Sequence, residues 1–134
     1  MKPRTWFTLA FGLMLAAMPA LAHHSFAAEF DPNKPIKLVG TVTKVEWMNP
    51  HVHFYMDVKD DAGQVSNWEF ELGSPNGLIR EGWSRNSLKP GDPITVDGFQ
   101  AKDGTKLGNA KSIQLSDGRR VFTGSSYKGP NENP

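Results

Sequence analysis

The fold of this chain is decided by one stretch, residues 45–58, which reads VEWMNPHVHFYMDV. Proline restricts the backbone of the residue before it, so Asn49-Pro50 predicts a turn. After the turn, apolar and polar residues alternate, as in a β-strand that buries one face. The buried face would carry Val52, Phe54, Met56 and Val58, and the opposite face would carry His51, His53, Tyr55 and Asp57.

The histidines fall into two close pairs. His51 and His53 share one face of the predicted strand, and the other two histidines are His23 and His24. Side chains on one strand face stand roughly 6.5–7 Å apart, so both imidazoles of the strand pair can point at one small ligand. The pairs therefore indicate a binding site built from imidazole.

The first 22 residues have the features of a secretory signal peptide. Lys2 and Arg4 give a positive start, an apolar run covers residues 6–17, and Ala-Leu-Ala at 20–22 is a cleavage site. The apolar run is short for a membrane span, and an uncleaved anchor is the alternative. Cleavage after residue 22 would make His23 the mature N-terminus of a periplasmic or secreted protein, with no membrane attachment left.

Length and composition limit the class of protein. A chain of 134 residues suffices for one domain. It has no cysteine, which removes disulfides, thiolate zinc sites and nucleophilic cysteine. Lys2 and Arg4 are two of the 15 basic residues, so 13 remain against 14 acidic residues, a formal charge of −1. That balance leaves no basic patch that would indicate nucleic acid.

The mature chain predicts one all-β domain with a single short helix. Residues 23–35 would form an N-terminal arm, residues 36–122 the domain, and residues 123–134 a disordered tail rich in Gly, Ser, Asn and Pro. Segments rich in Val and Thr, separated by turn residues, predict the strands. The predicted strands cover residues 36–47, 51–59, 65–72, 93–99 and 107–115, and the helix covers residues 75–83.

Three strands, a helix and two further strands are the order of an oligonucleotide/oligosaccharide-binding (OB) barrel. A slip in the alternation between Val42 and Val45, just after Gly40, predicts a bulge in the long first strand. The helix, capped by Ser74, would close the bottom of the barrel. A five-stranded open sheet or a sandwich is the alternative fold.

The same patterns predict which side chains are buried. The third strand would bury Trp68, Phe70 and Leu72 and present Asn67, Glu69 and Glu71, and the helix would bury Leu78, Ile79 and Trp83. In the arm, Phe26 and Phe30 are four residues apart. That spacing fits either one helical turn or an extended segment anchored by two aromatic rings.

Four short motifs stand out along the chain. They are Ala-His-His-Ser-Phe at 22–26, Gly-x-Val at 40–42, Trp-Met-Asn-Pro-His at 47–51 and Trp-x-Phe-Glu at 68–71. Together they resemble an uncharacterised family of small exported bacterial proteins, and the likeness covers most of the mature chain. The resemblance implies export and a common β-fold. Because the family has no established activity, the resemblance implies no mechanism.

A mature terminus at His23 would offer its α-amine and its own imidazole to one metal ion. A third nitrogen from His51 or His53 would complete a histidine brace, the arrangement of periplasmic copper carriers and copper oxygenases that this terminus resembles. Nitrogen ligands without thiolate favour Cu(II), with zinc as second choice. The candidate ligands are His23, His24, His51 and His53, and the candidate supporting residues are Trp47, Asn49, Tyr55, Asp57 and Glu71.

Metal-free interpretations remain open beside this one. The strand histidines could simply face solvent, or large aromatic side chains such as Tyr55 and Trp47 could form a binding surface. Glu69 and Glu71 could act as paired carboxylates, but such pairs on a strand face are usually solvated. The chain has no nucleophile elbow and no phosphate-binding loop, which predicts a non-enzyme.

The sequence therefore predicts an exported ligand-binding β-domain whose leading ligand is a copper ion. The alternative is a metal-free structural or interaction module that binds a protein or a small molecule on its β-surface. A protein partner of unknown identity is compatible with either, whereas nucleic acid is not expected.

Overall fold

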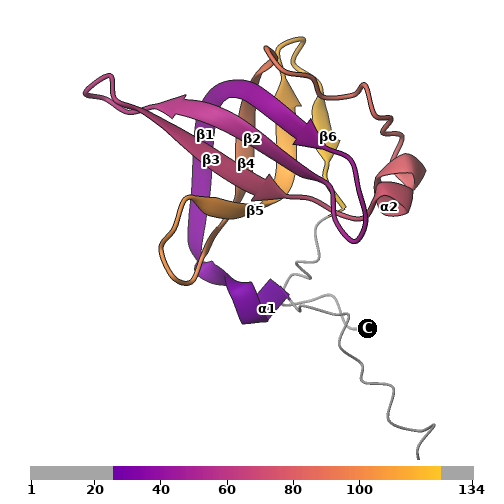
Figure 1. Cartoon of the computed structure of the whole chain (residues 1–134), viewed down its shortest axis with the longest axis horizontal. Coiled ribbons are helices and arrows are strands. Elements are labelled where there is room, and N and C mark those ends of the chain that lie inside the picture. The colour runs from indigo at the N-terminus through magenta and orange to yellow at the C-terminus, as the bar shows by residue number, and fades with distance from the viewer. Residues whose placement is uncertain (1–25, 125–134) are drawn as a thin grey trace, which may run out of the picture.

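The computed structural model describes residues 26–124, so the predicted leader and most of the predicted tail lie outside this description. The described chain is mostly β, with two short helices (Figure 1). The elements in chain order are α1 (Phe26–Glu29), β1 (Phe30–Glu46), β2 (His53–Lys59), β3 (Val65–Glu71), α2 (Pro75–Arg80), β4 (Pro93–Ala101), β5 (Leu107–Leu115) and β6 (Arg120–Phe122). Within residues 26–124, no helix has the length and apolarity that a membrane crossing requires.

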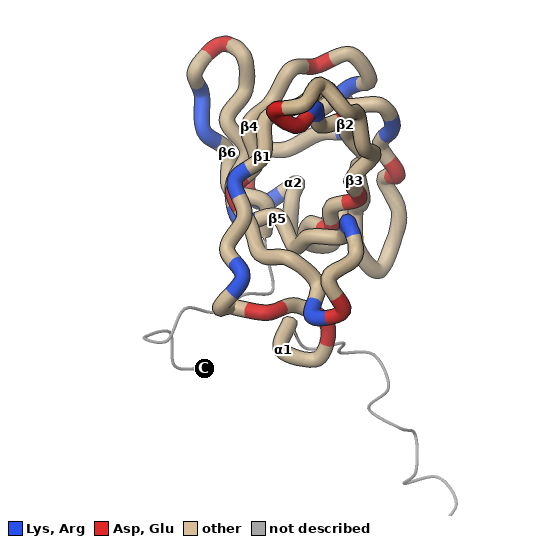
Figure 2. Tube along the Cα trace, turned by 90° about the vertical axis from the view of Figure 1, so that its left-hand side faces the viewer, with Lys and Arg blue, Asp and Glu red and all other residues tan. Residues whose placement is uncertain are grey.

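The strands form one six-stranded sheet in the order β3-β2-β1-β4-β5-β6, in which neighbours run antiparallel. A further, parallel pairing joins β3 to β5 and sets Glu69 opposite Leu107 and Phe70 opposite Gly108. Because of this pairing, β1, β2, β3, β5 and β4 close into a ring of paired strands (Figure 2).

All five strands of the ring contribute side chains to the main core. The alternation predicted for the second strand is confirmed, since Val52, Phe54 and Met56 are buried. The rings of Phe54 and Phe70 stack with centroids 5.2 Å apart. A Cβ atom at Gly108 would lie 2.6 Å from the Phe70 ring, so this glycine lets β5 pass close to the stack.

The helix α2 follows the predicted start but ends earlier. The Ser74 side chain accepts a hydrogen bond from the Gly77 amide at 3.1 Å, which caps the helix. Leu78 and Trp83 are buried as predicted, although Trp83 lies beyond the helix. The prediction for Ile79 is wrong, since its side chain is 55% exposed. A helix of 6 residues can present only one narrow face to the core.

The first strand is longer than predicted. It begins at Phe30, so residues 30–35 of the expected arm are strand, and β4 extends to Ala101 opposite Phe30. Phe26, Phe30 and Ala101 form a small second core, which anchors this extension. The predicted bulge is confirmed as a register shift between Val42 and Lys44.

The segment after β5 is also more ordered than predicted. Residues 120–122 form β6, which pairs with β5. Thr123, assigned to the tail by the sequence, is buried and accepts a backbone hydrogen bond from Gly73 at 2.8 Å. The Trp83 indole donates to the carbonyl of Phe122 at 2.8 Å, which holds β6 against the loop after α2.

Candidate functional site

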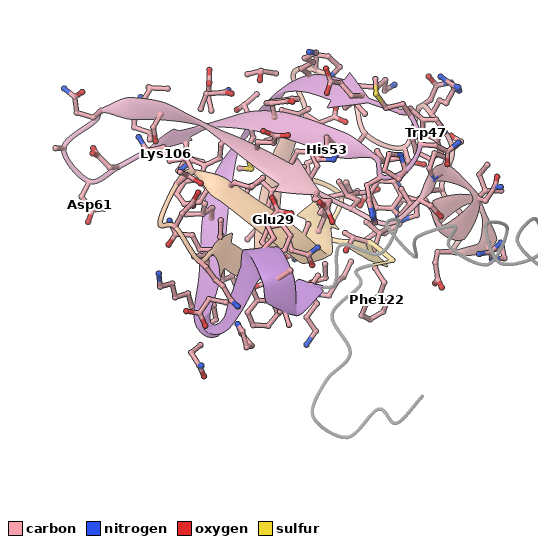
Figure 3. All side chains as sticks on the ribbon, turned by 60° about the horizontal axis from the view of Figure 1, so that its bottom comes forward. Glu29, Trp47, His53, Asp61, Lys106 and Phe122 are labelled. Carbon is pink, nitrogen blue, oxygen red and sulfur yellow. The ribbon has the colours of Figure 1, made fainter. Side chains whose placement is uncertain are left out.

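The strand β2 lies between β1 and β3, its polar face carries His53, and His51 lies just before its start. His53 and Tyr55 alternate with buried residues, so their side chains point away from the core. Figure 3 labels His53 on this strand. In the register of the sheet, Glu46 of β1 and Glu71 of β3 flank His53 on its two sides. We define the histidine face as Glu46, His51, His53, Tyr55, Glu69 and Glu71.

His53 is held by a carboxylate on the neighbouring strand. Its Nδ1 lies 2.8 Å from Oε1 of Glu69, with side chains 26% and 37% exposed. The contact is diagonal, because the residue directly opposite His53 is Glu71. The carboxylate can only accept, so the Nδ1 of His53 is the donor.

His51 is held in a similar way by the backbone. Its Nδ1 lies 3.0 Å from the carbonyl oxygen of Leu72 and 3.8 Å from Oε1 of Glu71. His51 precedes β2, which begins two residues later than predicted. Hydrogen bonds from Val52 to Gly73 and from Leu72 to Val52 nevertheless keep the two chains paired at this point.

These contacts determine which nitrogen of each imidazole is available. A neutral imidazole carries one proton, and a hydrogen bond that uses Nδ1–H leaves the lone pair on Nε2. His51 and His53 both donate from Nδ1 to oxygen atoms contributed by residues 69–72. Each ring therefore keeps an Nε2 lone pair for a ligand, as metal-binding histidines do when an outer oxygen atom fixes the ring.

Tyr55 joins two carboxylates beside His53. Its hydroxyl oxygen lies 3.2 Å from Oε2 of Glu46 and 3.2 Å from Oε1 of Glu69. Burial, followed by the negative charge of Glu69, raises the pKa of Tyr55 to about 12. The ammonium group of Lys44 pairs with Glu46, which lowers the pKa of that carboxyl, and lies 5.2 Å from the centre of the Tyr55 ring.

We expect Tyr55 to ionise near pH 12 in the folded protein, later than the ordinary tyrosine value of 10.0. Because the folded state holds this proton more tightly, the contribution to stability is complete below pH 10 and falls as the pH rises towards about 12. An alkaline titration followed by phenolate absorbance should show this late step, and Tyr55→Phe should remove it. A Tyr55 that ionised like free tyrosine would contradict the network.

The remaining candidates lie in different surroundings. Trp47 is half-buried and packs against the main core, and Asn49 is exposed in the turn. Asp57 accepts a hydrogen bond from the Asn67 side chain at 2.8 Å. Asp57 lies four residue steps along the strand from His53, about 13 Å, so Asp57 cannot orient that ring. His23 and His24 lie outside the described residues.

The described residues alone do not supply a complete metal site. Among residues 26–124, no three or more His, Asp or Glu side chains are grouped so that they could hold a metal ion. Two oriented imidazoles are present, and a further ligand would have to come from another part of the chain or from solvent.

Sequence reasoning missed the roles of Glu69 and Glu46. The strand pattern placed Glu69 on the correct face. It predicted Glu69 only as a solvated side chain or as a catalytic carboxylate paired with Glu71. Its diagonal contact with His53 depends on the register between β2 and β3, which the sequence does not specify. Glu46 is the last residue of β1, and its position opposite His53 depends on the bulge in β1.

The fold and this face define a small, mostly β protein with an oriented histidine pair on one face of its sheet. The chain belongs to a family of unknown function, DUF6152, whose model matches residues 11–110. The predicted membership of an uncharacterised family is therefore confirmed. No curated protein matches the chain.

Proposed function

We propose that the mature protein is an exported domain that binds a copper ion through His23, His51 and His53. The observation that carries this proposal is the pair of Nδ1 contacts, to Leu72 and to Glu69. They leave two Nε2 lone pairs on one face, and neutral imidazole nitrogens of this kind bind Cu(II) and Zn(II). The chain has no thiolate, so copper is preferred and zinc is second.

A ligand from the N-terminus would have to reach the histidine face from α1. Leu107 packs against the small core that contains Phe26, and it lies opposite Glu69 across the β3–β5 pairing. Two strand spacings, roughly 10 Å, separate Leu107 from β2. The three residues that precede Phe26 extend at most about 10 Å, so the proposal requires the His23 terminus to approach the histidine face within that length of α1.

The predicted N-terminus also gives the missing ligands. Cleavage after Ala22 would free the α-amine of His23, which can chelate a metal together with the imidazole of the same residue. His51 and His53 would then add one or two nitrogens, and His24 is a further candidate. N-terminal sequencing of the exported protein should accordingly read His-His-Ser-Phe.

We further propose that the ring of strands is an OB-like barrel with α2 at one end. In that fold, ligands bind on the face of the second and third strands, which is where the histidine face lies. The proposal assigns Glu69 and Glu71 a supporting role and no catalytic one. Periplasmic or secreted localisation follows from the signal peptide predicted for residues 1–22.

The experiment is a Cu(II) titration of the mature protein, followed by calorimetry. We expect binding at neutral pH that weakens as the pH falls, since protonated imidazole cannot bind a metal. His51→Ala and His53→Ala should each weaken binding by more than the ~10–100-fold cost of losing an outer hydrogen-bond partner.

Asp57→Ala is the matched control, because Asp57 lies on the same strand and contacts Asn67 rather than a histidine. Its affinity for copper should equal that of the unaltered protein. A mature protein that took up neither copper nor zinc at neutral pH would overturn the proposal and favour the metal-free interaction module.

A further inference from the structure

We infer that Glu69 is the positioning residue of the histidine face, the group that selects Nε2 as the ligating nitrogen of His53. The expected effect on copper affinity rests on the proposed function. The hydrogen bond between Glu69 and His53 is a property of the metal-free protein. Oε1 of Glu69 lies 2.8 Å from Nδ1 of His53, within the range of a charge-assisted hydrogen bond.

Glu69 is itself fixed in place by neighbours on both sides. Its backbone amide donates to the carbonyl of Lys106 at 3.0 Å, which ties β3 to the start of β5. On the other side, the Tyr55 hydroxyl lies 3.2 Å from the same Oε1 atom that accepts from His53. The carboxylate therefore has a defined position before any ligand binds.

The Tyr55 hydroxyl lies 3.2 Å from an oxygen atom of each carboxylate, Glu46 and Glu69. A phenol has one proton and can donate to only one of the two carboxylates that it contacts. Glu46 already has the ammonium group of Lys44 as its partner. Glu69 accepts from Nδ1 of His53 at 2.8 Å, so each carboxylate has one partner besides the shared phenol.

His51 provides an internal comparison. Its Nδ1 donates to the backbone carbonyl of Leu72, which no side-chain substitution removes. A change at Glu69 should therefore affect the proton position on His53 and leave His51 as it was. A general loosening of the face would affect both rings.

The test is a nitrogen NMR measurement of the imidazole tautomers in the metal-free protein. We expect Nδ1–H on both His51 and His53 in the unaltered protein. Glu69→Ala should return His53 to the mixture of tautomers found in water without changing His51. Glu69→Gln should keep the Nδ1–H tautomer, because its amide oxygen can still accept. Unchanged His53 tautomers in Glu69→Ala would overturn the inference.

A copper titration of the same variants then measures the consequence for binding. Glu69→Ala should lower the affinity for Cu(II) by about 10–100-fold, and Glu69→Gln should lower it less. Copper binding by Glu69→Ala as tight as that of the unaltered protein would also overturn the positioning role. A Glu69-dependent tautomer in a protein that binds no copper would instead refute the proposed function and leave the assignment of Nε2 standing.

Discussion

Replacing Phe70 with alanine is expected to lower the free energy of unfolding by about 3–5 kcal/mol, the usual cost of removing a buried phenyl ring. Phe70 is fully buried, stacks on Phe54 at 5.2 Å and approaches Trp68 at 6.1 Å. It also fills the space that Gly108 leaves open where β3 meets β5. Its loss would therefore leave a cavity at the contact that closes the ring of strands.

Urea denaturation of the metal-free protein measures this effect. Val65→Ala is a suitable control, because Val65 lies on the same strand and is 57% exposed, so its truncation should cost well under about 1 kcal/mol. Trp68, predicted to be buried, is only partly so and should cost less than Phe70 when truncated. Equal stabilities of Phe70→Ala and Val65→Ala would show that Phe70 does not support the ring closure.

Much of the fold could be predicted because one face of each strand is buried. The alternation after Asn49-Pro50 identified Phe54 and Met56 as core residues, and it placed His51 and His53 on the opposite face. Period-two patterns are reliable where a strand separates the core from solvent, since a slip of one residue would expose every apolar side chain.

The parts that could not be predicted depend on contacts between distant segments. The early start of β1 follows from the packing of Phe26 and Phe30 with Ala101, about 70 residues later in the chain. The strand β6 is only three residues long and is held by Trp83 and β5. A segment of three residues is too short to show a pattern of its own, so its partners decide that it forms a strand.

The candidate site, like the fold, could be predicted only in part. Its residue types were evident from the sequence, and the partner of each imidazole was not. Asp57 and Glu71 were the expected supporting groups. The structure sets Glu69 beside His53, and beside His51 it sets a backbone carbonyl together with Glu71 at 3.8 Å. Which carboxylate meets which ring depends on strand register and on diagonal reach, and both are properties of the paired strands.

The role of the N-terminal amine gives the second large effect that we expect. In a histidine brace, the α-amine and the imidazole of His23 chelate the metal together. Adding one residue before His23 converts that amine into an amide, which is a poor ligand, and leaves every side chain of the domain unchanged. Copper affinity should therefore fall by more than the ~10–100-fold cost of losing an outer hydrogen-bond partner.

The extended and unextended proteins must be compared with His24 replaced in both. With one added alanine, His24 would become the third residue, and an amine, two backbone amides and a third-position imidazole can bind Cu(II) without the domain. Both proteins should therefore carry His24→Ala, one beginning at His23 and the other with an alanine before it. Equal urea denaturation curves without metal would confirm that the extension leaves the fold unchanged.

The most direct test of the brace is the Cu(II) dissociation constant of these two proteins, measured by calorimetry at neutral pH. The account predicts tight binding by the protein that begins at His23 and a loss of more than ~10–100-fold on extension. His53→Ala should weaken binding further in the protein that begins at His23. Equal copper affinities for the two termini would contradict the brace, even if His51 and His53 still bound the metal.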